Sequence, residues 1–341
     1  MELAYRTATL RLAEPFTISR STSVEEEVLW VELRHDGVSG FGEAQPQEHY
    51  GESVAGAAAF LEEARGMLGD DPFALEAVGA RVGELHANGA AKAALDAALH
   101  DLCGKLVGQP AWRLLGLEPA GPPTSWTIWL GDPDDMARRA EHAGGHFQRL
   151  KLKLGGRDGL DVERVRAVRG VTGRPLQVDV NEYWTLDEAL EYVPELAHLG
   201  VQYVEQPLPA GDPGGEELRR NSPLPIYLDE DCHTLKDVRD CAERSHGVNI
   251  KLAKSGGIRE AVRMAHAARA LGLGVMLGCM IESGLGIAAA CQVASLCDHV
   301  DLDGNLLLAD DPWPGVTLRD GVQVASGEPG LGVDEAVSRT G

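Results

Sequence analysis

The sequence predicts an α/β protein, a (β/α)8-type barrel preceded by an N-terminal α+β region. Three observations predict this fold. Short apolar segments recur along residues 125–304, with starts 22 to 27 residues apart. Helical patterns such as 187–199 and 258–271 lie between most of these segments. Gly-Pro-Pro at 121–123 interrupts the chain just before the repeat begins, so the two parts are expected to be separate units.

The first part of the chain, about 120 residues, has the pattern of a small α+β unit. Strands are expected at residues 2–12 and 28–34, and the turn Asp36-Gly37 follows the second of them. Helices are expected at residues 53–66, 75–86 and 90–104. The last of these is rich in alanine, which favours helix, and Gly104 is the expected stop.

Eight segments are expected to form the strands of the barrel. They are residues 125–131, 149–155, 176–182, 201–207, 226–231, 248–254, 274–280 and 299–304. One strand, one helix and two short loops need about as many residues as separate their starts. A doubly wound open sheet is the competing interpretation, but the sequence has no GxGxxG phosphate loop to support it.

The amino-acid composition argues against some classes of binding partner and indicates a cellular compartment. The 341 residues are 44% hydrophobic, enough for one large core or two domains, and carry a net charge of −22. That charge argues against nucleic acid or an anionic membrane as a partner. No apolar stretch approaches the ~18 residues of a membrane helix, and no signal peptide is visible. The six cysteines lack zinc-like CxxC spacing, so a reduced, cytoplasmic protein is expected.

Polar residues gather at the ends of the expected strands. Active sites of (β/α)8 barrels lie at the carboxyl ends of the strands. The polar residues there are Lys151, Lys153, Asp179, Asn181, Glu205, Gln206, Asp229, Glu230, Asp231, Lys251, Lys254, Asp301 and Asp303. Charges rarely occupy apolar strands without partners or a ligand. We therefore expect them to converge on one cavity, and scattered surface charges or buried salt bridges are the alternative.

The residue types suggest a reaction. Asp179, Glu205 and Asp229 come from three consecutive strands, and a set of carboxylate oxygens suits a hard cation, above all Mg²⁺. Lys153 and Lys251 lie on strands before and after them, so they can approach a substrate from opposite sides. A lysine near a divalent cation has a lowered pKa and can act as a general base. The sequence therefore predicts Mg²⁺-assisted removal of a proton next to a carboxylate.

These motifs resemble those of the enolase superfamily. The matching residues are Lys151-Leu152-Lys153, Asp179 in DVN, Glu205 in EQP, Asp229 in LDED, Lys251 in VNIKLAKSGG and Asp301-Leu302-Asp303. The resemblance covers nearly the whole chain. It is to the muconate-lactonizing-enzyme subgroup and, within that, to dipeptide epimerases of the L-Ala-D/L-Glu type. One departure is LDED where the family usually has ADES, which retains the ligand aspartate and the glutamate after it.

The resemblance also implies a domain organisation. Residues 1–120 would form an α+β capping domain, residues 121–314 a modified (β/α)7β barrel, and residues 315–341 a segment that returns to the cap. The loop at 16–23 would then be a specificity loop, and 49–53 a second one. Arg20 is the only arginine in the first loop, and the resemblance implies that it binds the distal carboxylate of a glutamate side chain.

The implied activity is Mg²⁺-dependent epimerisation of a small-molecule dipeptide at the Cα of its C-terminal residue. Lys153 and Lys251 would exchange protons through an enediolate, converting L-Ala-L-Glu to L-Ala-D-Glu or a related dipeptide. Asp301 and Asp303 would grip the α-ammonium. Supporting residues around the ligands would be Lys151, Asn181, Glu230 and Lys254. The rivals are a cycloisomerase, an o-succinylbenzoate synthase, an N-acyl amino acid racemase and a non-catalytic ligand-binding barrel; assembly into a homo-oligomer is left open.

Overall fold

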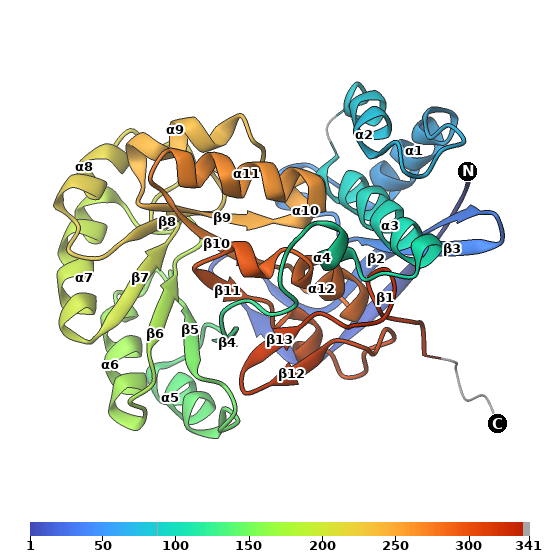
Figure 1. The fold of residues 1–341 in the computed structure, drawn as a ribbon. Coiled ribbons are helices and arrows are strands. Elements are labelled where there is room, and N and C mark those ends of the chain that lie inside the picture. Colours follow the sequence, from blue (N-terminus) through green and yellow to red (C-terminus); the bar gives the residue numbers. More distant parts are fainter. Residues whose placement is uncertain (87, 337–341) are drawn as a thin grey trace.

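Eight parallel strands form a nearly closed barrel, as predicted (Figure 1). The computed structural model describes residues 1–86 and 88–336. The strands, in their spatial order, are β4 (Ser125–Ile128), β5 (Arg149–Lys153), β6 (Leu176–Asp179), β7 (Val201–Glu205), β8 (Ile226–Leu228), β9 (Gly247–Lys251), β10 (Gly274–Gly278) and β11 (His299–Asp301). A parallel bridge between Thr124 and Val300 brings the two end strands together.

Helices cover the outside of the barrel. They are α5 (Pro133–His142), α6 (Asp161–Val171), α7 (Leu186–His198), α8 (Gly215–Asn221), α9 (Asp237–Arg244), α10 (Leu252–Ser255), α11 (Ile258–Ala270) and α12 (Gly284–Cys291). The sequence of α7 shows why they form. Thr185 and Glu188 make a capping box at its start, and Ala189, Val193 and Leu196 recur at helical spacing and are buried.

The barrel strands are shorter at their carboxyl ends than predicted. β8 ends at Leu228, so Asp229 lies just beyond the strand, and Lys254 lies on the short helix α10. At β6 the backbone explains the early end. Asn181 and Glu182 have φ values of 48° and 74°, in the left-handed region, which a continuing strand cannot accommodate. Most of the predicted polar residues therefore lie on the last residue of a strand or just after it, while Lys151 lies within β5 and Lys254 on α10.

The N-terminal cap is an antiparallel sheet covered by helices. Its elements are β1 (Glu2–Thr17), β2 (Thr22–His35), β3 (Val38–Ala44), α1 (Val54–Ala64), α2 (Leu75–Gly83), α3 (Gly89–Val107) and α4 (Ala111–Leu114). β1 and β2 are longer than predicted, and α3 continues past Gly104 to Val107, where Gly108 caps it with a φ of 66°. Gly104 is needed for close approach instead, because a Cβ there would lie 2.6 Å from the Cα of Gly330.

Four 3₁₀ turns complete the described elements: η1 (Glu48–Tyr50), η2 (Arg65–Met67), η3 (Ala294–Leu296) and η4 (Gly304–Leu307). A hairpin of β12 (Thr317–Arg319) and β13 (Val322–Val324) follows the barrel. The chain then reaches the cap, where the Leu331 amide donates to Asp101 Oδ1 of α3 at 2.7 Å. Of the segment predicted to return there, residues 337–341 lie outside the described part. No helix of the described residues is long and apolar enough to cross a membrane.

Cap and barrel share buried apolar contacts. Trp30 of β2 meets Trp313 edge to face with ring centroids 5.6 Å apart, and Phe41 of β3 lies 5.2 Å from the same ring. Glu43 of β3 accepts hydrogen bonds from the indole of Trp30 at 2.7 Å and from the backbone of Ser283, in the turn after β10, at 2.8 Å. These contacts fix the cap over the carboxyl ends of the barrel strands.

Close approach of β3 and α3 gives a stability prediction. A Cβ at Gly42 would lie 2.1 Å from the carbonyl oxygen of Ala94, and backbone cannot move aside as a flexible side chain can. We expect Gly42→Ala to destabilise the protein by about 1–3 kcal/mol or more. Gly66→Ala, where nothing lies within 4 Å of the new methyl group, is the matched control. Thermal unfolding of both variants measures the difference, and equal midpoints would contradict the packing described here.

Candidate active site

The inward faces of the barrel strands bring the predicted charged residues together. Lys151 and Lys153 alternate with leucines on β5, and both lysines are buried within the barrel mouth. Lys153 pairs in register with Asp179 on β6, and Asp179 with Glu205 on β7. These side chains therefore lie at one level of the barrel, and the lysines of RLKLK do not face solvent.

Four lysines neutralise the buried carboxylates. Lys151 Nζ lies 3.1 Å from Asp179 Oδ2, 2.8 Å from Glu205 Oε2 and 2.7 Å from Asp301 Oδ2. Lys153 Nζ lies 2.6 Å from Asp179 Oδ2. Lys251 and Lys254 contact the two oxygens of Asp229, at 2.8 and 2.5 Å. Lys254 also donates to the backbone carbonyl of Cys232 at 2.9 Å, so it holds the turn after β8 in place.

The pKa values follow from this pairing. Burial opposes ionisation of Asp179, yet Lys153 and Lys151 hold its pKa below the ordinary range. Burial and the adjacent Asp179 charge instead raise the pKa of Glu205 to about 7. Burial also opposes the charge of Lys251, but Asp229 raises its pKa above the ordinary value. Contact with Asp229 therefore favours the ammonium form of Lys251, and loss of this contact would favour the amine.

The carboxylates fit a hard divalent cation. Asp179, Glu205 and Asp229 offer only oxygen donors. Glu205 Oε2 and Asp229 Oδ2 are buried and accept no well-directed hydrogen bond. Each lies 2.8 Å from the ammonium group of a lysine, Lys151 for Glu205 and Lys251 for Asp229. Among residues 1–86 and 88–336, no three acidic, histidine or cysteine side chains already have the spacing of a formed metal site. The lysines hold the carboxylates in the arrangement seen here, and the donor chemistry suits Mg²⁺.

Residues beside these carboxylates form hydrogen bonds with them and with each other. The Asn181 backbone amide donates to Asp179 Oδ1 at 3.0 Å, and its side-chain amide donates to Glu230 Oε1 at 3.3 Å. Burial and the Asp229 charge raise the pKa of Glu230 to about 7. Gln206, which has a φ of 35°, accepts a hydrogen bond from the Asp229 amide at 2.8 Å.

A cavity of about 110 Å³ lies between the cap and these strand ends. Its barrel wall includes Lys153, Lys251, Asp301 and Asp303. Asp303 accepts a hydrogen bond from the Thr127 amide at 2.7 Å, and burial with the nearby Asp301 charge raises its pKa to about 7. Asp301 Oδ1 is buried without a hydrogen-bond partner. The two aspartates can therefore receive a positively charged group of a ligand.

The cap side of this cavity comes from the predicted loop at 16–23, from β2 and from the turn after β3, whereas no residue of the second predicted loop, 49–53, lines it. Its residues include Phe16, Ile18, Arg20, Ser23, Glu26 and Gln45. Arg20 lies where the sequence predicted it, at the cavity, but its guanidinium is already paired with carboxylates of the barrel. It donates to Glu230 Oε1 at 2.9 Å and to Glu182 Oε2 at 3.5 Å.

Two acidic residues at the mouth were not identified from the sequence. Glu182 joins both cap loops, because its Oε2 also lies 2.7 Å from the His49 ring. Glu26 lines the cavity from β2. Alternation along the strand could have identified Glu26, since it faces the opposite side from its exposed neighbours Glu25 and Glu27. Sequence offers no comparable signal for Glu182, whose contacts join residues 133 and 162 positions apart.

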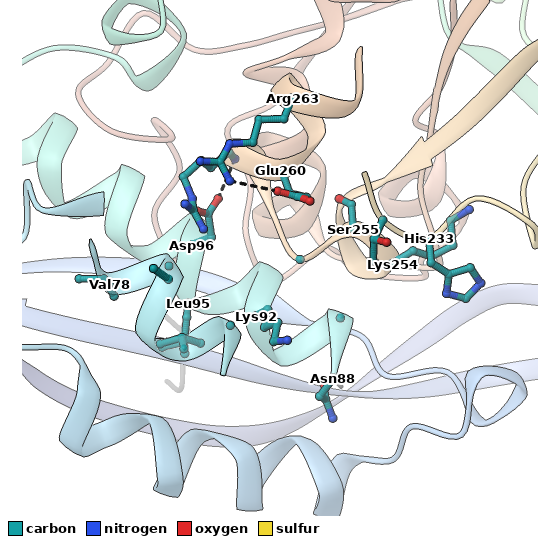
Figure 2. Close-up of a pocket in the computed structure, with 18 of the residues that line it drawn as sticks. Val78, Asn88, Lys92, Leu95, Asp96, His233, Lys254, Ser255, Glu260 and Arg263 are labelled. Carbon is teal, nitrogen blue, oxygen red and sulfur yellow. Dashed lines mark hydrogen bonds and ion pairs between the residues drawn. The ribbon is translucent and has the colours of Figure 1, made fainter. Parts of the chain in front are cut away.

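A larger cavity, of about 700 Å³, lies between cap helices α2 and α3 and barrel helices α10 and α11. Figure 2 shows Asn88, Lys92 and Asp96 on its cap side and Lys254, Ser255, Glu260 and Arg263 on its barrel side. Several of its charges are paired, as Arg259 Nη1 lies 3.0 Å from Glu76 and Arg263 Nη1 lies 3.4 Å from Glu260. Lys153 and Lys251 both face the smaller cavity, which is therefore the candidate active site.

Comparison with known proteins matches both parts of the chain. The model described as "Mandelate racemase / muconate lactonizing enzyme, N-terminal domain" matches residues 1–116, and "Enolase C-terminal domain-like" matches residues 134–336. An L-Ala-D/L-Glu epimerase of Bacteroides thetaiotaomicron is 37% identical, covering 98% of this chain and 88% of that protein. An L-Ala-D/L-amino acid epimerase of Pedosphaera parvula is 39% identical, covering 94% and 95% of the two chains.

A solved structure shows the same arrangement of the chain. The crystal structure of a dipeptide epimerase from Enterococcus faecalis, complexed with Mg and the dipeptide L-Leu-L-Tyr, superimposes with a TM-score of 0.94 at 30% identity. The match covers 98% of this chain and 99% of that one.

Proposed function

This chain belongs to the enolase superfamily, in the branch of mandelate racemase and muconate lactonizing enzyme, and on that premise we propose that it epimerises dipeptides at the Cα of the C-terminal residue. The observation that carries the proposal is the placement of two lysines. Lys153 on β5 and Lys251 on β9 are four strands apart in the order of an eight-stranded barrel, and both line the cavity under the cap. The relatives named as dipeptide epimerases support this reaction.

Inversion at a carbon needs groups on both faces. One lysine removes the α-proton as an amine, and the other, as an ammonium, returns a proton to the opposite face. The substrate lies between them, so that their roles exchange with the configuration of the substrate. The separation of the two lysines across the mouth is what permits inversion, since a single base would return the proton to its own side.

The remaining residues of the site bind and orient the dipeptide. Asp179, Glu205 and Asp229 would hold Mg²⁺, which supplies electrostatic stabilisation for a substrate carboxylate whose negative charge grows as the α-proton leaves. Asp301 and Asp303 receive the α-ammonium group of the N-terminal residue. This group would donate a charge-assisted hydrogen bond to Asp301 Oδ1, which is buried without a partner. Lys151 keeps the aspartate and glutamate side chains in place.

Proton exchange tests the proposal directly. The purified protein with Mg²⁺ is incubated in D₂O with L-Ala-L-Glu, L-Ala-L-Leu and L-Ala-L-Lys, and ¹H NMR follows the α-proton of the second residue. We expect exchange together with appearance of the L,D epimer for at least one dipeptide. The matched N-acetyl dipeptide, which has no α-ammonium for Asp301 and Asp303, should react far more slowly. Faster reaction of the N-acetylated compound would instead indicate an N-acyl amino acid racemase.

A further inference from the structure

We propose that Glu26 sets the charge preference of the pocket for the substrate side chain, so that this chain favours dipeptides whose epimerised residue carries a cationic side chain. The inference rests on the proposed epimerase function and names its substrate class. It concerns the cap wall of the cavity, where the charged side chains are Arg20 and Glu26.

The positive charge on this wall already has partners. Arg20 Nη2 lies 2.9 Å from Glu230 Oε1, and Arg20 Nη1 lies 3.5 Å from Glu182 Oε2. The side chain of Glu230 is 1% exposed, so removal of the guanidinium would leave a buried carboxylate without its cation. These contacts use donors on both terminal nitrogens of Arg20, and two carboxylates balance its single positive charge, so a further carboxylate from a substrate would meet a guanidinium already neutralised. Arg20 therefore acts as a positioning residue that holds the loop at 16–23 against the barrel.

Two further hydrogen bonds also hold this loop against the barrel. Ser19 Oγ donates to the Asn181 carbonyl at 3.3 Å, and the Leu130 amide donates to the Thr17 carbonyl at 2.9 Å. The cap loop is thus attached to the turns after β4 and β6, on either side of Lys153. In this position of the loop, the positive charge of Arg20 is balanced by Glu182 and Glu230.

The negative charge of Glu26 on this wall is not balanced by a neighbouring cation. Glu26 Oε2 accepts a hydrogen bond from the Gln45 side chain at 3.1 Å, and within the described residues Glu26 takes part in no ion pair. Burial raises the pKa of Glu26, hydrogen bonds from Ser23 and Gln45 oppose this only in part, and the nearby Glu48 charge adds to the rise. A half-buried carboxylate without a cation is poorly solvated, and a cationic ligand group would restore the lost interaction. The net charge of −22 also favours the approach of a cationic dipeptide.

The test compares Glu26→Gln with Glu27→Gln. Both variants remove one carboxylate from β2, but Glu27 is exposed and lies outside the cavity. Isothermal titration calorimetry with the Mg²⁺-loaded proteins measures the Kd of L-Ala-L-Lys, L-Ala-L-Leu and L-Ala-L-Glu, and NMR measures kcat/KM for the same three. We expect wild type to favour the lysine dipeptide, and Glu26→Gln to weaken it by about 10- to 100-fold while leaving the leucine dipeptide unchanged. Glu27→Gln should behave as wild type.

The outcomes are distinguishable. A wild-type preference for L-Ala-L-Glu, or equal losses for all three dipeptides in Glu26→Gln, would overturn the assignment of Glu26 while leaving the epimerase function intact. Binding with the expected preference but without α-proton exchange would contradict the epimerase function and support the pocket assignment. Failure to bind any of the three would contradict both.

The variant Arg20→Met distinguishes the role of Arg20 from that of Glu26. If Arg20 holds the loop closed, kcat/KM should fall by a similar factor for all three dipeptides, because each needs the same closed cavity. The resemblance noted in the sequence gives the opposite expectation, a rise in KM for L-Ala-L-Glu far larger than that for L-Ala-L-Leu. That selective result would assign Arg20 to the substrate carboxylate and overturn the inference.

Discussion

Lys153→Ala and Lys251→Ala should each reduce epimerisation to the background rate, while each variant still exchanges the α-proton of one epimer. The expectation follows from the position of the two lysines across the barrel mouth. The remaining lysine can remove and return a proton on its own face, which exchanges hydrogen for deuterium without inversion. ¹H NMR of each variant with the L,L and the L,D dipeptide in D₂O measures both processes. General acid–base catalysis typically contributes about 10²- to 10⁴-fold, so the loss should be easily measured.

We expect both variants to fold, because each affected carboxylate keeps a second lysine. Asp179 keeps its contact with Lys151 when Lys153 is removed, and Asp229 keeps its contact with Lys254 when Lys251 is removed. Neither substitution therefore leaves a buried carboxylate without a cation. Lys236→Ala, at an exposed position away from the active-site cavity, is the matched control and should behave as wild type. Interconversion of the two epimers at near wild-type rate by either single variant would exclude the two-base mechanism.

Much of this arrangement could be predicted from local patterns. Period-two alternation in RLKLKLGG placed Lys151 and Lys153 on one face, and the recurrence of short apolar segments predicted a barrel that turns this face inward. The carboxylates followed from their place at strand ends. Such features depend on neighbours in sequence, and so a single sequence is enough to indicate them.

Contacts between distant segments could not be predicted in the same way. The pairing of Arg20 with Glu230 joins residues 210 positions apart, and it depends on how the cap sits over the mouth. The end of α3 is a similar case. Gly104 is a residue type that often ends a helix, yet α3 continues to Val107. The glycine is instead required because the returning chain at Gly330 packs against it. Tertiary packing decides such positions, and local propensity gives no information about it.

The site also shows what a metal ion must change. The charges of Asp179, Glu205 and Asp229 are balanced by lysines, including the two that the proposed reaction needs as proton carriers. A base cannot accept a proton while it is an ammonium group bound to a carboxylate. Binding of Mg²⁺ among the same oxygens would compete with these contacts and make the lysines available to a substrate. Metal binding and catalysis should therefore depend on the same three carboxylates.

Asp179→Asn, Glu205→Gln and Asp229→Asn should accordingly each abolish both the activity and the response of the protein to Mg²⁺. A ligand that binds the folded state alone stabilises it by about 2.7 kcal/mol at a concentration of 100 times its Kd, so Mg²⁺ should raise the thermal midpoint of wild type. Each variant should lose that increase, and EDTA should remove it from wild type together with the activity. Asp240→Asn makes the same substitution at an exposed position and should keep the full increase.

The thermal measurement keeps this prediction independent of turnover. Circular dichroism of each variant without metal shows first that it is folded, and calorimetry then gives the Kd for Mg²⁺ directly. Asp179→Asn and Asp229→Asn are the most informative of the three, because two lysines contact each of the side chains that they alter. If rigorously metal-free wild type retained full epimerase activity, or if Asp229→Asn bound Mg²⁺ as tightly as wild type, the three carboxylates would not be the metal site. Their burial would then have to be explained by the lysine pairs alone.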